Sequence, residues 1–169
     1  MDRSDFLGYW ARVHDRTRRV LALLPERQLG WQAREDGFSL GALARHIAMS
    51  ERHLFVETAL HDRSTMPGPD QPTPRTKAAI LALVDQLHAD SVALVEGMPA
   101  ERWTARCRTP GGAEVRVDRW LQLMLEHEIH HRGQLYLMLG MLGIETPPLY
   151  GLTAEQVQEV SHGPTPKAD

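Results

Sequence analysis

The sequence is poor in the residues that build several common kinds of site and segment. It has a single cysteine, Cys107, in 169 residues, which excludes an internal disulfide and a cysteine-rich metal site. No run of apolar residues approaches 18 without interruption, and no apolar run follows the charges at the start of the chain. A membrane span and an export signal are therefore not expected, and a reducing cytoplasm is the expected location.

Excess charge of one sign is also absent. Nineteen Lys and Arg residues face 22 Asp and Glu residues, which gives a formal net charge of −3. No basic block with interleaved aromatic residues is present, so a nucleic-acid partner is not expected. The length fits one domain spanning residues 1–169, with a core large enough to fold without disulfides.

Hydrophobic periodicity predicts an all-α protein with four long helices. Ser39, Thr73 and Asp118 are predicted to cap the last three of them. A proline-rich connection at 63–74 separates the second helix from the third, because its four prolines forbid regular structure. Four amphipathic helices in one domain predict a four-helix bundle. The predicted helices span residues 4–24, 39–61, about 73–96 and about 119–142.

Two smaller elements are predicted near the last long helix. Gly111 and Gly112 lie between weakly alternating segments within residues 103–117, a pattern that favours a small hairpin before that helix. Thr153 and Gln156 have the spacing of a capping box, which predicts a short final helix.

The fourth helix carries a histidine pair on its predicted apolar face. His127 and His131 occupy positions where the stripe of apolar residues is interrupted. Residues four apart on a helix lie about 5–6 Å from each other at Cβ, so both imidazoles can reach one cation. A third ligand is expected from a facing helix, where His46 is the best candidate and His53 the fallback.

The remaining histidines and the tryptophans have simpler interpretations. His130 is out of phase with the pair and is predicted to face outward or toward a subunit contact. The tryptophans are expected to serve core or interface packing: Trp10, Trp31, Trp103 and Trp120. Four histidines show no ligand spacing and are predicted to lie on the surface: His14, His61, His88 and His162.

The segment HEIHH also satisfies the H-E-x-x-H pattern of zinc peptidases, in which the glutamate, here Glu128, is the general base. The metzincin extension fails, because Gln134 and Leu137 occupy the positions that require glycine and histidine. A zinc peptidase stays an alternative.

Two segments, EHEIHHRGQLYLMLGMLGIETPPLYGL and SLGALARHIAMSE, closely resemble the DinB/YfiT-like superfamily of metal-binding four-helix bundles. The resemblance implies up-down-down-up connectivity, a homodimer, and one divalent ion, zinc or nickel, held by three histidines. Residue by residue, these fall on His46, His127 and His131. It also implies a small-molecule substrate, because some members are S-transferases or isomerases that use bacillithiol or mycothiol and others are described as hydrolases.

Three neutral imidazoles leave a coordination position open, which suits catalysis better than a closed structural site. The sequence therefore favours a metal-dependent enzyme for thiol S-transfer or for hydrolysis of a small molecule. A non-enzymatic metal-binding or structural dimeric bundle is the alternative.

Several neighbours of the histidine pair have open roles. Glu128 is predicted to act as a base or to support a ligand, or else to pair with Arg132 one turn away. Gly133 is expected to allow close helix approach, and Gln134 to brace a ligand loop. Tyr150 is expected to line the pocket mouth or to pack.

Overall fold

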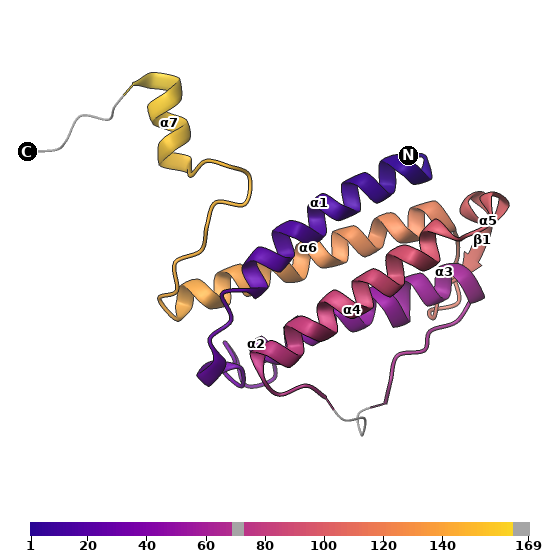
Figure 1. Cartoon of the computed structure of the whole chain (residues 1–169), viewed down its shortest axis with the longest axis horizontal. Coiled ribbons are helices and arrows are strands. Elements are labelled where there is room, and N and C mark those ends of the chain that lie inside the picture. The colour runs from indigo at the N-terminus through magenta and orange to yellow at the C-terminus, as the bar shows by residue number, and fades with distance from the viewer. Residues whose placement is uncertain (69–72, 164–169) are drawn as a thin grey trace, which may run out of the picture.

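The computed structural model describes residues 1–68 and 73–163. Four long helical segments lie side by side (Figure 1). The second of them is three consecutive helices: α2 (Leu40–Met49), the π-helix η2 (Ser50–Val56) and α3 (Glu57–His61). The other three are α1 (Arg3–Leu21), α4 (Lys77–Glu96) and α6 (Val117–Met141). The predicted all-α four-helix bundle is confirmed.

The helices have up-down-down-up connectivity (Figure 1). Helices α1 and α6 run in one direction and pack together, while α2 and α4 run in the other direction and pack together. Two parallel neighbours need a connection that returns along the bundle. The segment between α3 and α4 makes this return, and its described residues, 62–68 and 73–76, contain no helix or strand. The proline-rich connection was therefore predicted correctly.

Short elements complete the chain. A 3₁₀ turn, η1 (Glu26–Gln28), and a helix, α5 (Ala100–Thr104), precede the predicted hairpin. Its strands β1 (Arg106–Arg108) and β2 (Glu114–Arg116) pair antiparallel. The final helix, α7 (Ala154–His162), has the predicted capping box and lies away from the bundle with all its residues exposed (Figure 1).

The helix starts test the predicted caps. Ser39 accepts a hydrogen bond from the Ala42 N–H, as predicted. Thr73 does not cap α4, because Thr76, closer to the apolar run, accepts from the Ala79 N–H. Asp118 does not cap α6 either. The helix begins one residue before it, and its carboxylate instead accepts two hydrogen bonds from the Arg116 guanidinium.

The buried side chains form two apolar clusters with a polar layer between them. One cluster includes Leu21 and Leu139 toward one end of the bundle, and the other includes Phe6 and Leu121 toward the other end. Trp10 and Trp103 are buried in the second cluster, so their predicted packing role is confirmed. Between the clusters, several buried residues are polar or charged: Thr17, Ser50, Glu51, Ser91, Glu128, His131 and Arg132.

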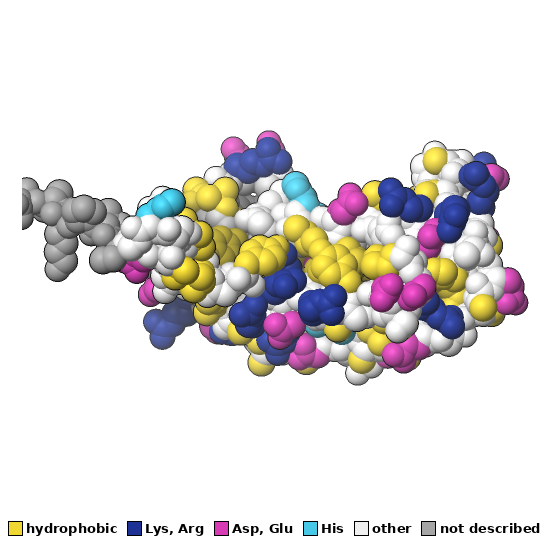
Figure 2. Space-filling model, turned by 90° about the horizontal axis from the view of Figure 1, so that it is seen from above, with side chains coloured by type: hydrophobic (Ala, Val, Ile, Leu, Met, Phe, Trp, Pro, Cys, Tyr) yellow, Lys and Arg dark blue, Asp and Glu magenta, His cyan; other side chains and the backbone are white. Residues whose placement is uncertain are grey.

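Helix α4 is, by length and composition, apolar enough to cross a membrane. Its apolar residues have a structural explanation in the bundle, where Ile80, Val84 and Val95 are buried. Its exposed Asp85 accepts two hydrogen bonds from the Arg18 guanidinium of α1. The face formed by α1 and α6 shows patches of apolar side chains between charged ones of both signs (Figure 2).

The apolar core predicts a strong contrast between two leucines of α6. Leu139 is fully buried and Leu137 is 66% exposed, although they are two residues apart. We expect Leu139→Ala to lower the free energy of unfolding by about 2–5 kcal/mol, because a cavity replaces packed atoms. Leu137→Ala serves as the control, with an expected change within about 0.5 kcal/mol. Urea denaturation measures both, and equal effects would contradict this packing.

Candidate metal centre

Three histidines from two helices bring their ring nitrogens together in the middle of the bundle. Helix α2 provides His46, and α6 provides His127 and His131. The Nε2 atom of His127 lies 3.2 Å from that of His46 and 3.1 Å from that of His131. One nitrogen of each ring lies within 4.8 Å of the others. The structure thus brings together the three residues that periodicity and family resemblance predicted.

The donor set fits a divalent ion. Ligands that each lie about 2.0–2.1 Å from one ion are roughly 3.0–3.4 Å apart, the spacing of these nitrogens. Burial lowers the pKa of His127 to about 4, with further lowering by His131, His46 and His130. Burial, and next His131, also lowers the pKa of His46. The rings are therefore neutral near pH 7, the form in which imidazole binds metal.

Two polar side chains touch the ligand rings. The Gln134 Oε1 accepts a hydrogen bond from the Nδ1 of His131, at 2.7 Å, which leaves the Nε2 lone pair directed toward the other histidines. Gln134 therefore braces a ligand directly rather than a loop. The Ser50 hydroxyl lies 3.4 Å from the His46 ring.

Aromatic rings surround the histidines. Phe38 stacks on His46 with 4.8 Å between ring centroids, and Phe55 lies 5.2 Å from the His127 ring. Phe38 and Gln134 also line a cavity of about 300 Å³, together with Arg34 and Leu43. Sequence reasoning missed both phenylalanines. The one available signal for Phe38 was its position just before the Ser39 cap, where an apolar residue often packs against the first turns of the helix.

The histidines outside the cluster lie in several different environments. His130, His61 and His162 are exposed, as predicted. His53 is not needed as a ligand, and its Nδ1 faces the Thr65 hydroxyl at 3.2 Å. The prediction that His14 and His88 lie on the surface was wrong. Both are half-buried, and their rings stack on each other in the bundle. Their helices α1 and α4 bring them together, which spacing along the chain cannot reveal.

Glu128 is buried, with 3% of its surface exposed, and neither carboxylate oxygen has a hydrogen-bond partner among the described residues. The alternative prediction that it pairs with Arg132 was wrong. The Arg132 guanidinium donates instead to the Val13 carbonyl and the Thr17 hydroxyl of α1. Burial, and next the charge of Glu51, raises the pKa of Glu128 to about 7.

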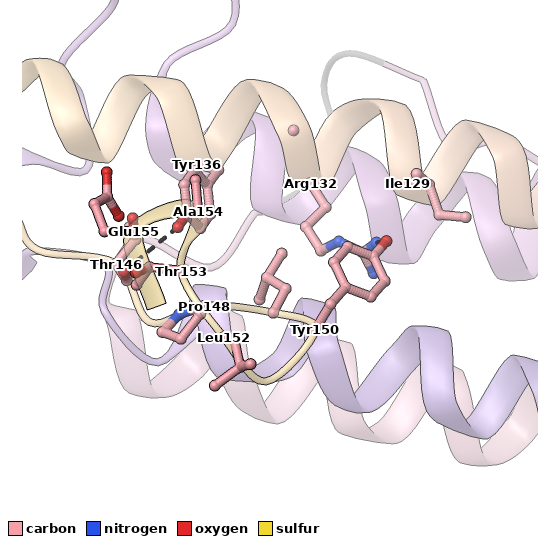
Figure 3. A pocket seen from close by; sticks show the side chains of 12 residues that line it. Ile129, Arg132, Tyr136, Thr146, Pro148, Tyr150, Leu152, Thr153, Ala154 and Glu155 are labelled. Carbon is pink, nitrogen blue, oxygen red and sulfur yellow. Dashed lines mark hydrogen bonds between the residues drawn. The ribbon is translucent and has the colours of Figure 1, made fainter. Parts of the chain in front are cut away.

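Another cavity, of about 630 Å³, lies on a different side of α6 (Figure 3). Tyr150 lines it together with Arg132, whose guanidinium donates to the Tyr150 hydroxyl at 3.4 Å. Tyr150 therefore borders a pocket, but none of the three clustered histidines lines that pocket. Gly133 also lines it and is exposed, with open space where a Cβ would lie, so the prediction of close helix approach was wrong.

The fold and the histidine cluster agree with a comparison against known families. The family model described as DinB superfamily matches residues 9–135. The chain belongs to the DinB superfamily. It is also 26% identical over 155 residues to the uncharacterized protein YrdA of Bacillus subtilis, with 89% of each chain covered.

Solved DinB-like structures share the fold. A DinB-like protein of Bacillus subtilis, YjoA, has a TM-score of 0.72 at 21% identity, covering 88% of this chain and 99% of its own. YfiT of Bacillus subtilis, described as a probable metal-dependent hydrolase with an unusual four-helix bundle topology, has a TM-score of 0.64 at 17% identity and coverages of 85% and 89%. A mycothiol-dependent maleylpyruvate isomerase has a TM-score of 0.56 at 16% identity, covering 80% of this chain and 61% of its own.

The bond from His131 to Gln134 predicts a defined effect on metal affinity. We expect Gln134→Ala to weaken zinc binding by about 10–100-fold, because the His131 ring loses the acceptor that fixes its tautomer and orientation. Gln86→Ala, which removes an exposed glutamine bonded to Asp90, is the matched control and should leave affinity unchanged. Titration calorimetry measures both, and equal affinities would refute the role of Gln134.

The low pKa of His127 predicts how the metal-free protein responds to acid. The unfolded chain takes up this proton below about pH 6.5, whereas the folded protein resists until about pH 4. The free energy of unfolding should therefore fall as the pH falls from 6.5 toward 4. In the presence of a chelator, His127→Gln should make this dependence shallower, and His61→Gln should leave it unchanged. Urea denaturation at several pH values tests this, and identical slopes for all three proteins would contradict it.

Proposed function

We propose that this DinB-superfamily protein is a metal-dependent S-transferase, which uses His46, His127 and His131 to hold one zinc or nickel ion and to activate a low-molecular-weight thiol. The observation that carries the proposal is the convergence of three neutral imidazoles at ligand spacing. Zinc and nickel suit imidazole ligands, which are of intermediate softness.

The residues at the site support an open coordination position. No carboxylate, cysteine or fourth histidine of the described chain joins the ligand atoms of the cluster. A divalent ion held in this way supplies a Lewis acid that lowers the pKa of a thiol or a water bound in the open position.

The surroundings favour a thiol over water. Thiols ionise near pH 8.5 when free, so only a small shift is needed and no protein base is required. Glu128 is the base that the sequence suggested, but its buried carboxylate interacts with Glu51 and His88 and with none of the three clustered histidines. Phe38 and Phe55 add apolar walls, which suit an organic electrophile better than a peptide in extended form. These features do not support a zinc peptidase.

The protein's residues have separate tasks in the transfer. The three rings and Gln134 hold the site in place, and the aromatic walls limit the water that competes with the thiol. The thiol proton passes to solvent, a new bond forms between sulfur and the electrophilic carbon, and the leaving group departs with its electron pair. Bacillithiol and mycothiol are the thiols we propose to test, since a mycothiol-dependent enzyme shares the fold.

Hydrolysis of a small molecule is the second candidate. The open position can also accept water, and YfiT, which shares the fold, is described as a probable metal-dependent hydrolase. The two reactions differ in their need for an added thiol, so one assay separates them.

We expect the zinc-loaded or nickel-loaded protein to conjugate bacillithiol or mycothiol to a chloro-bimane electrophile, with the rate followed by fluorescence. His127→Ala and His131→Ala should lose the bound ion and lower the rate at least about 100-fold, since two imidazoles hold a first-row ion poorly. His61→Ala is the control, because His61 is exposed and outside the cluster.

The outcomes discriminate between the functions. A rate that equals the His131→Ala background with every thiol would remove the transferase. Cleavage of a p-nitrophenyl ester without thiol, lost in His131→Ala and kept in His61→Ala, would replace it with the hydrolase. A tightly bound ion with neither activity would favour the non-enzymatic bundle.

A further inference from the structure

A second group of ligand-type side chains lies in the polar layer of the bundle, apart from the three clustered histidines. Each of the four long helical segments contributes one member. Two histidines and one glutamate place ligand atoms within 4.8 Å of one another: His14 of α1, Glu51 of η2 and His88 of α4. The fourth, Glu128 of α6, is buried beside them.

The distances between His88 and Glu51 are those of two ligands around one ion. The Nδ1 atom of His88 lies 3.2 Å and 3.3 Å from the two carboxylate oxygens of Glu51. These two separations fall near the roughly 3.0–3.4 Å expected of two atoms bound to one cation. His14 stacks on His88 with 3.4 Å between ring centroids and offers a ring nitrogen within 4.8 Å of the other two ligand atoms.

The start of the π-helix η2 places Glu51 in this group. Glu51 lies four residues after the buried Ile47, so it continues the buried face of α2. Glu51 has 5% of its surface exposed and faces α1 and α4, where Trp10 Nε1 donates to its Oε2 at 3.2 Å. Ser50, one residue earlier, lies against His46 instead. The same helix thus serves two separate groups.

Glu128 is the observation that requires a ligand. Both its oxygens are buried without a hydrogen-bond partner among the residues described. The nearby Thr17 hydroxyl donates to the Val13 carbonyl, and the Arg132 guanidinium to that carbonyl and to Thr17. An unsatisfied buried carboxylate is strongly unfavourable, and the charge of Glu51 close by makes it more so.

We propose that one divalent transition-metal ion, of the zinc and iron class, binds in the middle of the bundle to four side chains: His14, Glu51, His88 and Glu128. Two imidazoles and two carboxylates are a common ligand set for such ions, and one ligand from each helix is how bundle cores build metal sites. A charge of +2 also offsets the charges of the two buried carboxylates, Glu51 and Glu128.

The second site shares no ligand with the three clustered histidines. His127 and Glu128 are adjacent on α6 but meet different partners, His46 in the first case and the Glu51 and His88 pair in the second. Each site can therefore be removed without deleting a ligand of the other. The second site does not depend on the proposed transferase activity.

The test removes the first site and counts the ions that remain. We expect His46→Ala/His131→Ala protein, saturated with zinc and freed of excess by gel filtration, to retain one zinc per chain by elemental analysis. Adding His88→Ala or Glu128→Gln to this background should weaken zinc binding at least 10-fold in competition with a chelating dye. His61→Ala, which changes an exposed histidine, is the matched control and should retain the zinc.

Each outcome decides the proposal. Absence of zinc from the His46→Ala/His131→Ala protein would overturn it. Retention of zinc after both His88→Ala and Glu128→Gln would overturn it as well, because the ion would then lie elsewhere. Far-ultraviolet circular dichroism checks that each variant is folded, and Glu128→Gln preserves shape if the histidine change does not fold. An anomalous zinc signal within bonding distance of His14 and His88 in crystals of the wild type would confirm the assignment.

Discussion

Burial of polar groups in the middle of a helical bundle is the constraint on which the rest of this structure depends. Two apolar clusters fill the ends of the bundle, and side chains such as Glu51, Glu128 and Arg132 occupy the layer between them. Each such group needs a partner, because a buried charge without one is unfavourable by several kcal/mol or more. The layer therefore gathers the ligand-type side chains, while the two apolar clusters supply the packing around them.

The connectivity of the bundle decides which side chains meet in that layer. Because α1 packs on α6 and α2 on α4, each long segment contacts two others, and the layer gathers residues from all four. The antiparallel packing of α2 against α6 brings His46 to His127 and His131. The facing pair α1 and α4 brings His14 to His88. One arrangement of helices thus builds two groups of ligand-type side chains at the same level.

Local patterns in the sequence were sufficient for the first group and insufficient for the second. His127 and His131 interrupt an apolar stripe at helical spacing, and a lone histidine among apolar residues identified His46. No such pattern marks His14 and His88, which lie one each on helices distant in sequence. Glu51 continues the buried stripe of α2, four residues after Ile47. Its partners lie on α1 and α4, and periodicity within one helix does not reveal them. Helix boundaries failed for a related reason, since both Thr73 and Thr76 have the side chain of a cap and only the backbone decides between them.

The long connection between α3 and α4 has a consequence for how the protein is made. It lets α1 and α6, the first and last of the long helices, become parallel neighbours, so the Val13 carbonyl receives its hydrogen bond from a residue 119 positions later. A growing chain on the ribosome holds α1, α2 and α4 well before α6 emerges. During that interval α6 is missing from the polar layer, and the three earlier helices expose the surface that α6 will cover. The nascent protein is therefore most vulnerable to aggregation and proteolysis until α6 has emerged.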